Sequence, residues 1–179
     1  MFKKAEHSQV TISELMLPSH SNFSGKIHGG YILNLMDQIA FACASKHSRH
    51  YCVTASVNKV NFLNPIEVGE IVTLKASVNY TGRSSMVVGV RVESENIQRG
   101  SVKHCNSSYF TMVAIGEDRK PTKVPGLILE DKESIRRFVR SIKRQEQSLK
   151  RSDQFKKSEF KIEEYLHLLE NHNLKIELD

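Results

Sequence analysis

The sequence of 179 residues has little proline, few cysteines and no long apolar run. It contains only 4 prolines and 9 glycines, and 39% of its residues are hydrophobic, which excludes a collagen-like repeat, a mucin-like stalk and a wholly disordered chain. The longest nearly uncharged stretch, residues 27–45, includes an aspartate, two glycines and two amides, so it falls short of a membrane span. The N-terminus lacks the apolar run of roughly 7–15 residues that a signal peptide needs. We therefore expect a cytoplasmic protein with no membrane partner.

Cysteine pairs and the common cofactor or metal motifs are also missing. Cys43, Cys52 and Cys105 cannot all pair and show no C-x-x-C spacing, so we expect reduced, mostly buried thiols. There is no G-x-S-x-G, H-E-x-x-H, Walker-type or dinucleotide-binding motif. His47 and His50 have no further ligands at metal spacing. We therefore expect neither a metal ion nor a cofactor.

Charge separates a body from a tail. Residues 132–157 carry a net charge of +7 and residues 158–179 a net charge of −4, and apolar residues recur at helical spacing in both segments. We predict two amphipathic helices here, with a break near residues 152–157. The chain is accordingly divided into a domain of residues 1–127 and a charged C-terminal helical extension of residues 128–179.

The pattern of apolar residues in the body predicts one strand, one long helix and then four strands. Weak alternation over residues 10–17 suggests the first strand, and residues 31–47 predict a helix whose apolar residues fall on most faces, so that protein should surround it. Four strand candidates separated by turn signals follow, at residues 51–63, 72–80, 86–92 and 102–115. Within residues 51–63 the apolar residues move from odd to even positions near Asn58, which suggests a β-bulge or a change of buried face. This order favours an α+β fold in which an antiparallel sheet curls around the central helix.

Asp37 is the most informative residue of the predicted helix. It is the only charged side chain between Gly30 and Ser45, and taking an unpaired carboxylate out of water costs several kcal/mol or forces its pKa upward. Perturbed carboxylates correlate with function. A side chain that faces a wet edge of the helix, or that pairs with Lys or Arg, would explain Asp37 equally well.

Two glycine-containing segments are candidates for ligand contact. Gly29 and Gly30 open the helix, whose first N–H groups could polarise a substrate carbonyl, although a tight turn would look the same. Residues 81–85 combine N–H groups, hydroxyls and a guanidinium, which suit phosphate, but a plain hairpin turn is the alternative.

Five ordered motifs carry a family resemblance. They are NFSGKIHGG at residues 22–30, LMD at 35–37, VTASV at 53–57, YTGRSSM at 80–86 and FTMVA at 110–114. Over about residues 8–127 the chain closely resembles the hot-dog-fold acyl-CoA thioesterases of the acyl-CoA hydrolase group. The resemblance implies a long central helix wrapped by a curled antiparallel sheet. It also implies a dimer as the minimal unit, and commonly a homohexamer built as a trimer of dimers.

The resemblance further implies hydrolysis of acyl-CoA to a free carboxylate and coenzyme A. Asp37 would be the general base or the nucleophile, and Asn22 would come from the opposite subunit. The N–H of Gly29 or Gly30 would hold the thioester oxygen. The other residues expected to bind the acyl-CoA are His28, Thr54, Lys59, Phe62, Gly82, Arg83, Ser84 and Ser85. Coenzyme A is part of the substrate and product, so no separate cofactor is implied.

Other functions stay open at this point. A non-catalytic acyl-CoA-binding protein would share the same site, and a hot-dog dehydratase or hydratase would need a histidine paired with a carboxylate, for which His28 alone lacks the motif. The basic segment 132–157 could bind nucleic acid, but it has few aromatic residues and an acidic segment follows it. The expected partners are therefore an acyl-CoA and further copies of this chain, without nucleic acid.

Overall fold

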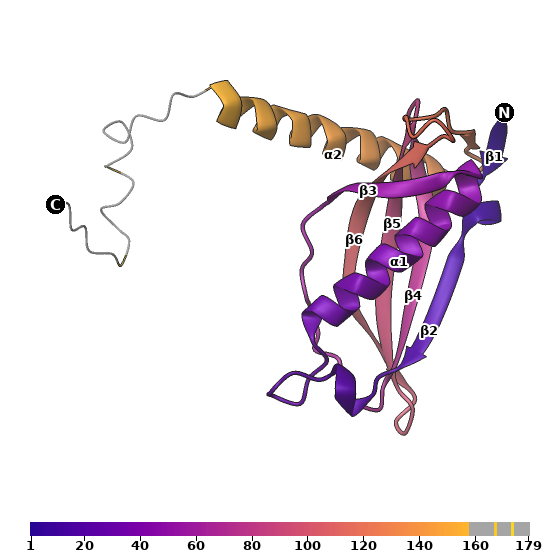
Figure 1. Ribbon diagram of the computed structural model, residues 1–179. Helices are drawn as coiled ribbons and strands as arrows, with labels where there is room; N and C mark the ends of the chain where they lie inside the picture. The colour runs from indigo at the N-terminus through magenta and orange to yellow at the C-terminus, as the bar shows by residue number, and fades with distance from the viewer. Residues whose placement is uncertain (158–166, 168–172, 174–179) are drawn as a thin grey trace. The chain divides into compact units, whose positions relative to one another are not determined.

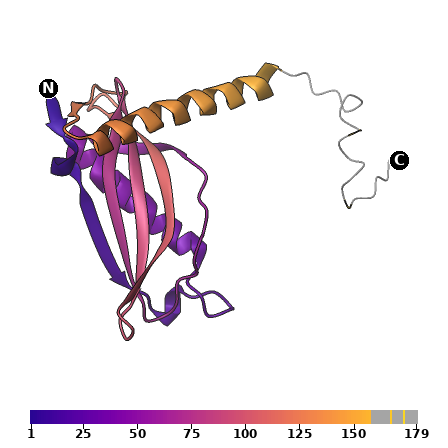
Figure 2. The same ribbon diagram turned by 180° about the vertical axis from the view of Figure 1, so that it is seen from behind.

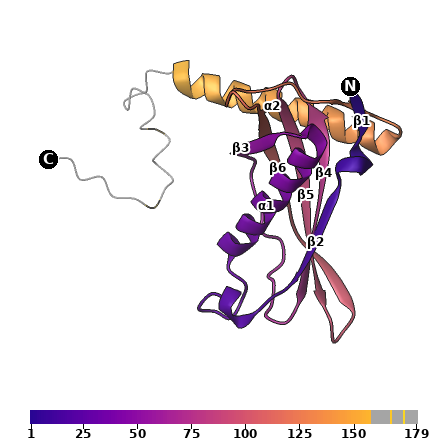
Figure 3. The same ribbon diagram turned by 45° about the vertical axis from the view of Figure 1, so that its right-hand side comes forward.

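The computed structural model describes residues 1–157 together with His167 and Asn173, and it shows a five-stranded antiparallel sheet curled around one long helix (Figure 1). The strand order in this sheet is β2-β4-β5-β6-β3. The elements are β2 (Val10–Leu15), α1 (Gly29–Ser48), β3 (Tyr51–Val57), β4 (Ile71–Thr81), β5 (Ser85–Asn96) and β6 (Ser101–Ile115). Figure 3 shows α1 lying in the concave side of the sheet. The prediction of an α+β hot-dog fold is confirmed.

Local chemistry sets both ends of α1. The helix begins after His28, whose Nδ1 accepts a hydrogen bond from the Gly30 N–H (3.2 Å). It ends at Arg49, which adopts φ +64° and donates its N–H to the Ser45 carbonyl (2.8 Å). The side of α1 that faces the sheet carries the buried apolar residues Ile32, Leu35, Met36, Ile39, Ala40, Cys43 and Ala44.

The opposite side of α1 is open in the single chain. Leu33, Asp37 and Phe41 follow one another at four-residue spacing, and all three are exposed. The prediction that protein surrounds this helix is therefore wrong for one protomer, because the sheet covers one side only. The neighbouring strand β3 is an edge of the sheet, and its Tyr51 and Val53 side chains are exposed as well.

Strand β3 is shorter than predicted. It ends at Val57, and the pairing with β6 shifts register between Thr54 and Ser56, which places a bulge inside the strand and not near Asn58. Asn58 still bonds to β6 through the Tyr109 carbonyl (2.9 Å), and beyond it the chain arches away from β6. It returns at Leu63, whose N–H donates to the Cys105 carbonyl (2.9 Å).

Several short elements were not predicted. β1 (Phe2–Lys4) and β7 (Gly126–Ile128) pair in parallel as a separate two-stranded sheet. Two short 3-10 helices, η1 (Ala5–Ser8) and η2 (Pro18–His20), flank β2. Elements of three or four residues contain too few positions for hydrophobic periodicity to identify them.

The basic tail forms the helix α2 (Lys132–Lys157). It starts beside Asp131, whose Oδ1 accepts the Ser134 N–H (2.6 Å). Its first turns lie across the outer face of the sheet (Figure 2), where the rings of Phe138 and Tyr80 are 4.9 Å apart. α2 continues through Lys157, and the break expected near residues 152–157 stays a prediction, because the residues directly after Lys157 lie outside the described part of the chain.

The rest of the tail prediction concerns mostly residues that the structure does not describe. The second predicted helix, in residues 158–179, lies outside the described residues. Residues Met1–Ile142 form one compact unit and residues Lys143–Asp179 a second, so the first compact unit includes the start of α2. The division at residue 127 stays a prediction.

His47 joins α1 to the N-terminal segment and to the chain before β7. It is completely buried, with Nε2 3.0 Å from the Pro125 carbonyl oxygen and Nδ1 3.3 Å from the Ser8 hydroxyl. Burial lowers the pKa of this imidazole, the hydrogen bond to Pro125 opposes the shift, and the nearby Lys3 ammonium adds to it. The folded protein therefore holds His47 neutral.

We expect this protein to lose stability as the pH falls below 6.5, the ordinary pKa of histidine. Below that pH the unfolded chain takes up a proton at His47 that the folded chain resists, because the folded pKa is lower. The stability due to neutral His47 is thus complete above pH 6.5 and declines toward the lowered folded pKa. Urea unfolding at pH 7.5 and 5.5 measures the effect. A His47→Gln variant should show a smaller difference between the two pH values, and an unchanged difference would contradict this account.

Candidate active site

Asp37 and Thr54 meet at the open side of α1. The Thr54 hydroxyl, on the edge strand β3, donates a hydrogen bond to Asp37 Oδ1 (2.7 Å). Both residues are exposed in the single chain, so the expected desolvation of Asp37 is not provided by one protomer. Asp37 Oδ2 has no hydrogen-bond partner among the described residues. The Thr54 hydroxyl therefore orients the carboxylate through Oδ1, and Oδ2 is open to a water or a substrate.

The start of α1 offers one open backbone donor. The Gly30 N–H already donates to His28, whereas the Gly29 N–H has no partner in the part of the chain that the structure describes. A methyl group added at Gly29 would lie 3.2 Å from Cζ of Phe62, so the Phe62 ring packs directly against this glycine. Of the two N–H groups predicted to hold a thioester oxygen, that of Gly29 is open, while that of Gly30 would have to exchange His28 for the substrate.

Asn22 lies in a tight loop just before α1. Its Oδ1 accepts hydrogen bonds from the N–H (3.0 Å) and hydroxyl (2.7 Å) of Ser24 and from the N–H of Lys26 (3.2 Å). Its Nδ2 makes no hydrogen bond to any described residue, and none joins Asn22 to Asp37 there. The loop thus uses the acceptor of Asn22 and leaves its donor free. Its action in an opposite subunit stays a prediction.

The turn that is predicted to bind the phosphates of coenzyme A does not lie near the start of α1. Residues 82–85 form the turn between β4 and β5, where the Gly82 N–H donates to the Ser85 carbonyl (2.8 Å). The start of α1 lies near the other end of β4, since the Ile27 N–H bonds to the Ile66 carbonyl (2.9 Å). The 11 residues of β4 between these ends span roughly 35 Å.

The two positively charged side chains that are predicted to bind the phosphates of coenzyme A are exposed. Arg83 lies in the turn between β4 and β5, and Lys59 lies in the arch that follows β3. Neither side chain has an ion-pair partner among the described residues. One protomer therefore brings together Asp37 with Thr54, and separately His28, Gly29, Gly30 and Phe62, but not the turn that is predicted to bind the phosphates.

Neither the Cys43 thiol nor a cluster of metal-binding side chains provides a second candidate site in the described part of the chain. Burial raises the pKa of Cys43 to about 12, which keeps this thiol protonated and inert. Among the described residues no group of three or more His, Cys, Asp or Glu could hold a metal ion. No helix within the described ranges is both long and apolar enough to cross a membrane.

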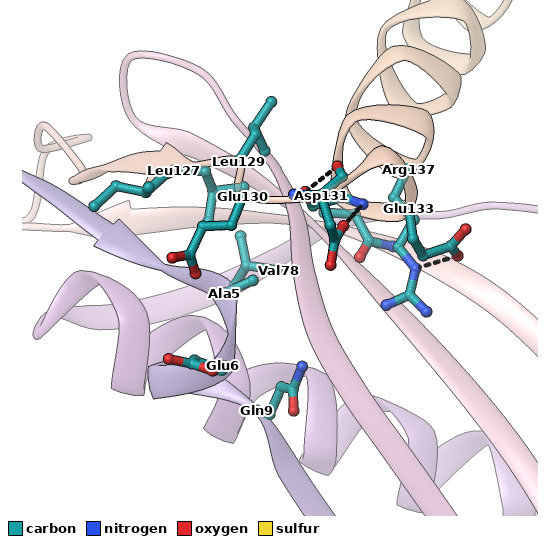
Figure 4. Close-up of a pocket in the computed structure, with 13 residues that line it drawn as sticks. Ala5, Glu6, Gln9, Val78, Leu127, Leu129, Glu130, Asp131, Glu133 and Arg137 are labelled. Carbon is teal, nitrogen blue, oxygen red and sulfur yellow. Dashed lines mark hydrogen bonds and ion pairs between the residues drawn. The ribbon is translucent and has the colours of Figure 1, made fainter.

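A cavity of about 300 Å³ that the sequence did not predict opens between η1, β7 and the first turns of α2 (Figure 4). Two of its acidic groups, Glu130 and Glu133, already have cationic partners, and Asp131 caps α2 through the Ser134 N–H. Glu130 Oε1 lies 2.7 Å from Lys4 Nζ, and Glu133 Oε1 lies 2.8 Å from Arg137 Nε. The cavity contains none of the predicted site residues, and no sequence signal marked it because η1 and β7 are too short to predict.

Known proteins are similar to this chain in both sequence and fold. Residues 24–101 match the thioesterase superfamily. Protein VdlD of Helicobacter pylori is 41% identical over 139 residues, which are 78% of this chain and 79% of VdlD. A solved hexameric acyl-CoA thioesterase superposes with a TM-score of 0.82 at 36% identity, over 84% of this chain and 97% of that one.

A third similar protein is an acyl-CoA hydrolase of Staphylococcus aureus, solved with butyryl coenzyme A, coenzyme A and coenzyme A disulfide. It superposes with a TM-score of 0.80 at 30% identity, over 93% of this chain and 99% of that one. Variants of it with alanine in place of an aspartate, an asparagine or a threonine have also been solved. Identity at this level over most of each chain, together with a curled sheet around one helix, shows common descent. This chain belongs to the hot-dog-fold acyl-CoA thioester hydrolases of the thioesterase superfamily.

Proposed function

We propose that this protein hydrolyses acyl-CoA to a free carboxylate and coenzyme A, and that Asp37 is its general base or nucleophile. The observation that carries the proposal is the Asp37 carboxylate, oriented by the Thr54 hydroxyl at 2.7 Å and open at its second oxygen. The aspartate, asparagine and threonine replaced in the S. aureus hydrolase have the same spacing along their chain as Asp37, Asn22 and Thr54 here. This agreement supports a role for all three residues.

The length of α1 argues for a site made by two protomers. Asp37 lies eight residues after Gly29, a separation of about 12 Å along the helix axis. A single thioester carbonyl cannot meet both groups of one helix. We therefore assign Asp37 and Thr54 to one protomer, and Gly29 and Asn22 to the other protomer of the same site.

The chemistry follows from these positions. The thioester oxygen accepts the open Gly29 N–H at the positive end of α1, which stabilises negative charge as it develops. As general base, Asp37 removes a proton from a water that attacks the carbonyl carbon, the carbon–sulfur bond breaks, and the thiolate of coenzyme A takes up the proton. As nucleophile, Asp37 displaces the thiolate to form a mixed anhydride, which water then cleaves to regenerate the carboxylate. In either route the free Nδ2 of Asn22 donates a hydrogen bond to the water or to the carbonyl.

Oligomer formation is part of the proposal. The edge of β3 is unpaired in one protomer, and Leu33 and Phe41 are exposed on the same side of α1 as Asp37, so a second copy would cover this side symmetrically. The similarity to a hexameric thioesterase supports a hexamer of three such dimers. Burial of this surface would supply the apolar surroundings of Asp37 that one protomer lacks.

The remaining assignments concern the binding of coenzyme A. We assign Gly82, Arg83, Ser84 and Ser85, with Lys59, to its phosphates, because they offer exposed cations, hydroxyls and N–H groups. The strand-length separation of residues 82–85 from Gly29 requires this turn to come from a different protomer than the one that holds the thioester oxygen. Lys59 is not separated in this way, since it lies three residues before Phe62, which packs against Gly29. Cytoplasmic residence also stays a prediction, to which the three free, buried thiols are suited.

A hydrolysis assay tests the proposed function. The purified full chain is incubated with acyl-CoA substrates from acetyl to palmitoyl, and released thiol is measured. We expect turnover with at least one chain length. Binding of acyl-CoA without thiol release at any length would favour the non-catalytic acyl-CoA-binding alternative.

A further inference from the structure

Phe23 is fully exposed beside Asn22. Its side chain has a relative exposure of 114%, the highest of any large apolar residue in the described part of the chain. The residue is internal, so fraying of a chain end does not explain this exposure. A completely exposed phenylalanine next to a proposed catalytic group needs a physical reason, because burial of such a ring is strongly favoured.

The loop that carries Phe23 is closed by its own hydrogen bonds. The Asn22 N–H donates to the Lys26 carbonyl (2.7 Å), and the Gly25 N–H donates to the Asn22 carbonyl (3.0 Å). Gly25 makes the turn at φ +75°, in the region that favours glycine. The Asn22 side chain closes the same loop through its bonds to Ser24 and Lys26.

The loop is also attached to the body of the protein. Lys26 forms an ion pair with Glu67, and the Ile27 N–H bonds to the Ile66 carbonyl (2.9 Å). The only charged side chain of the loop is thus paired, so no free charge favours an anionic partner. The loop presents one apolar ring on a fixed support.

We propose that Phe23 is a positioning residue that docks on a second copy of this chain and so places Asn22 of its own protomer beside Asp37 of the other. This inference rests on the proposed two-chain site. The second copy presents a matching surface, because Leu33 and Phe41 flank Asp37 on the same side of α1 and both are partly exposed, at 36% and 38%. Phe23 and Asn22 are consecutive, with Cα atoms about 3.8 Å apart, so fixing the ring fixes the amide.

The docked ring has two consequences for the reaction. It excludes water from one side of Asp37, which strengthens the electrostatic interactions there. It also removes freedom from Asn22, and a misplacement of about 1 Å can cost on the order of 10²-fold in rate. Phe23 does not itself contact the reacting atoms, so its replacement should lower kcat and change KM little.

Mixed oligomers test the inference. A chain with Asp37→Asn and a chain with Asn22→Ala are coexpressed with different affinity tags, and oligomers that carry both tags are purified. Each mixed pair contains one intact site, made of Asn22 from the first chain and Asp37 from the second, and one site with both groups altered. Phe23→Ala is then placed either on the first chain, beside the intact Asn22, or on the second chain.

We expect kcat to fall about 10- to 100-fold more when Phe23→Ala is on the first chain than when it is on the second. Phe23→Leu on the first chain should retain most of the activity, and Ile135→Ala on the first chain, a change of an exposed apolar residue in α2, should leave it unaltered. Light scattering checks that the oligomers are of equal size, so a general loss of assembly would be detected.

Two other results would overturn the inference in different ways. Equal losses from Phe23→Ala on either chain, in an otherwise active mixed oligomer, would reject the positioning role and leave the proposed function intact. A mixed oligomer that is inactive before Phe23 is altered would reject the two-chain site itself, and the inference with it.

Discussion

Replacement of Asp37 by asparagine is expected to lower kcat for acyl-CoA hydrolysis by about 10²–10⁴-fold, the range associated with loss of a general acid or base. The change keeps the size of the side chain, and its amide oxygen can still accept the Thr54 hydroxyl. It removes the charge and the basic oxygen that would take a proton from water or attack the thioester. Thiol release measures kcat, and calorimetry with coenzyme A measures binding, which should persist.

A matched control separates this effect from a general loss of charge. Asp118 is an exposed aspartate in the turn after β6, and Asp118→Asn should leave hydrolysis and oligomer size unaltered. Full activity of the Asp37→Asn protein would remove Asp37 from the reaction. Loss of both activity and coenzyme A binding would instead indicate a disrupted site.

The Asn22→Asp variant is expected to lose about 10²–10³-fold in kcat while the protein keeps its fold and oligomeric state. Aspartate can accept the same hydrogen bonds from Ser24 and Lys26 that asparagine accepts, so the loop should persist. It cannot donate as Nδ2 does, and removal of one donor to a developing oxyanion typically has an effect of this size. Kinetics and light scattering measure the two properties.

Asn22→Ala serves as the comparison for this variant. It removes the donor and also the three hydrogen bonds that close the loop, so it should lower both activity and thermal stability. Should Asn22→Asp retain full activity while Asn22→Ala does not, Asn22 would act only through the shape of the loop.

Asp37 was identifiable from the sequence because it stands alone in an apolar segment, and the strand and helix order followed from hydrophobic periodicity over long elements. The exposed side of α1 was not predicted, because an apolar residue looks the same in a sequence whether its own chain or another copy buries it. The same ambiguity applies to the expectation that protein surrounds α1, which one protomer meets only on the side that faces the sheet.

His28 shows another limit of sequence reasoning. It was predicted to bind coenzyme A, yet in the free protein its ring accepts the Gly30 N–H and caps α1. Histidine is not among the side chains that commonly cap helices, so no pattern in the sequence marked this role. The distance between residues 82–85 and the start of α1 was not accessible, since it depends on which end of β4 each segment joins.

A crystal structure of the Asp37→Asn protein with an uncleaved acyl-CoA would test the central claim most directly. We predict that the thioester carbonyl lies within about 2.6–3.2 Å of the Gly29 N–H of one protomer and close to residue 37 of another. The Nδ2 of Asn22 should come from the same protomer as Gly29. A thioester bound wholly within one chain, or far from any boundary between chains, would contradict the account.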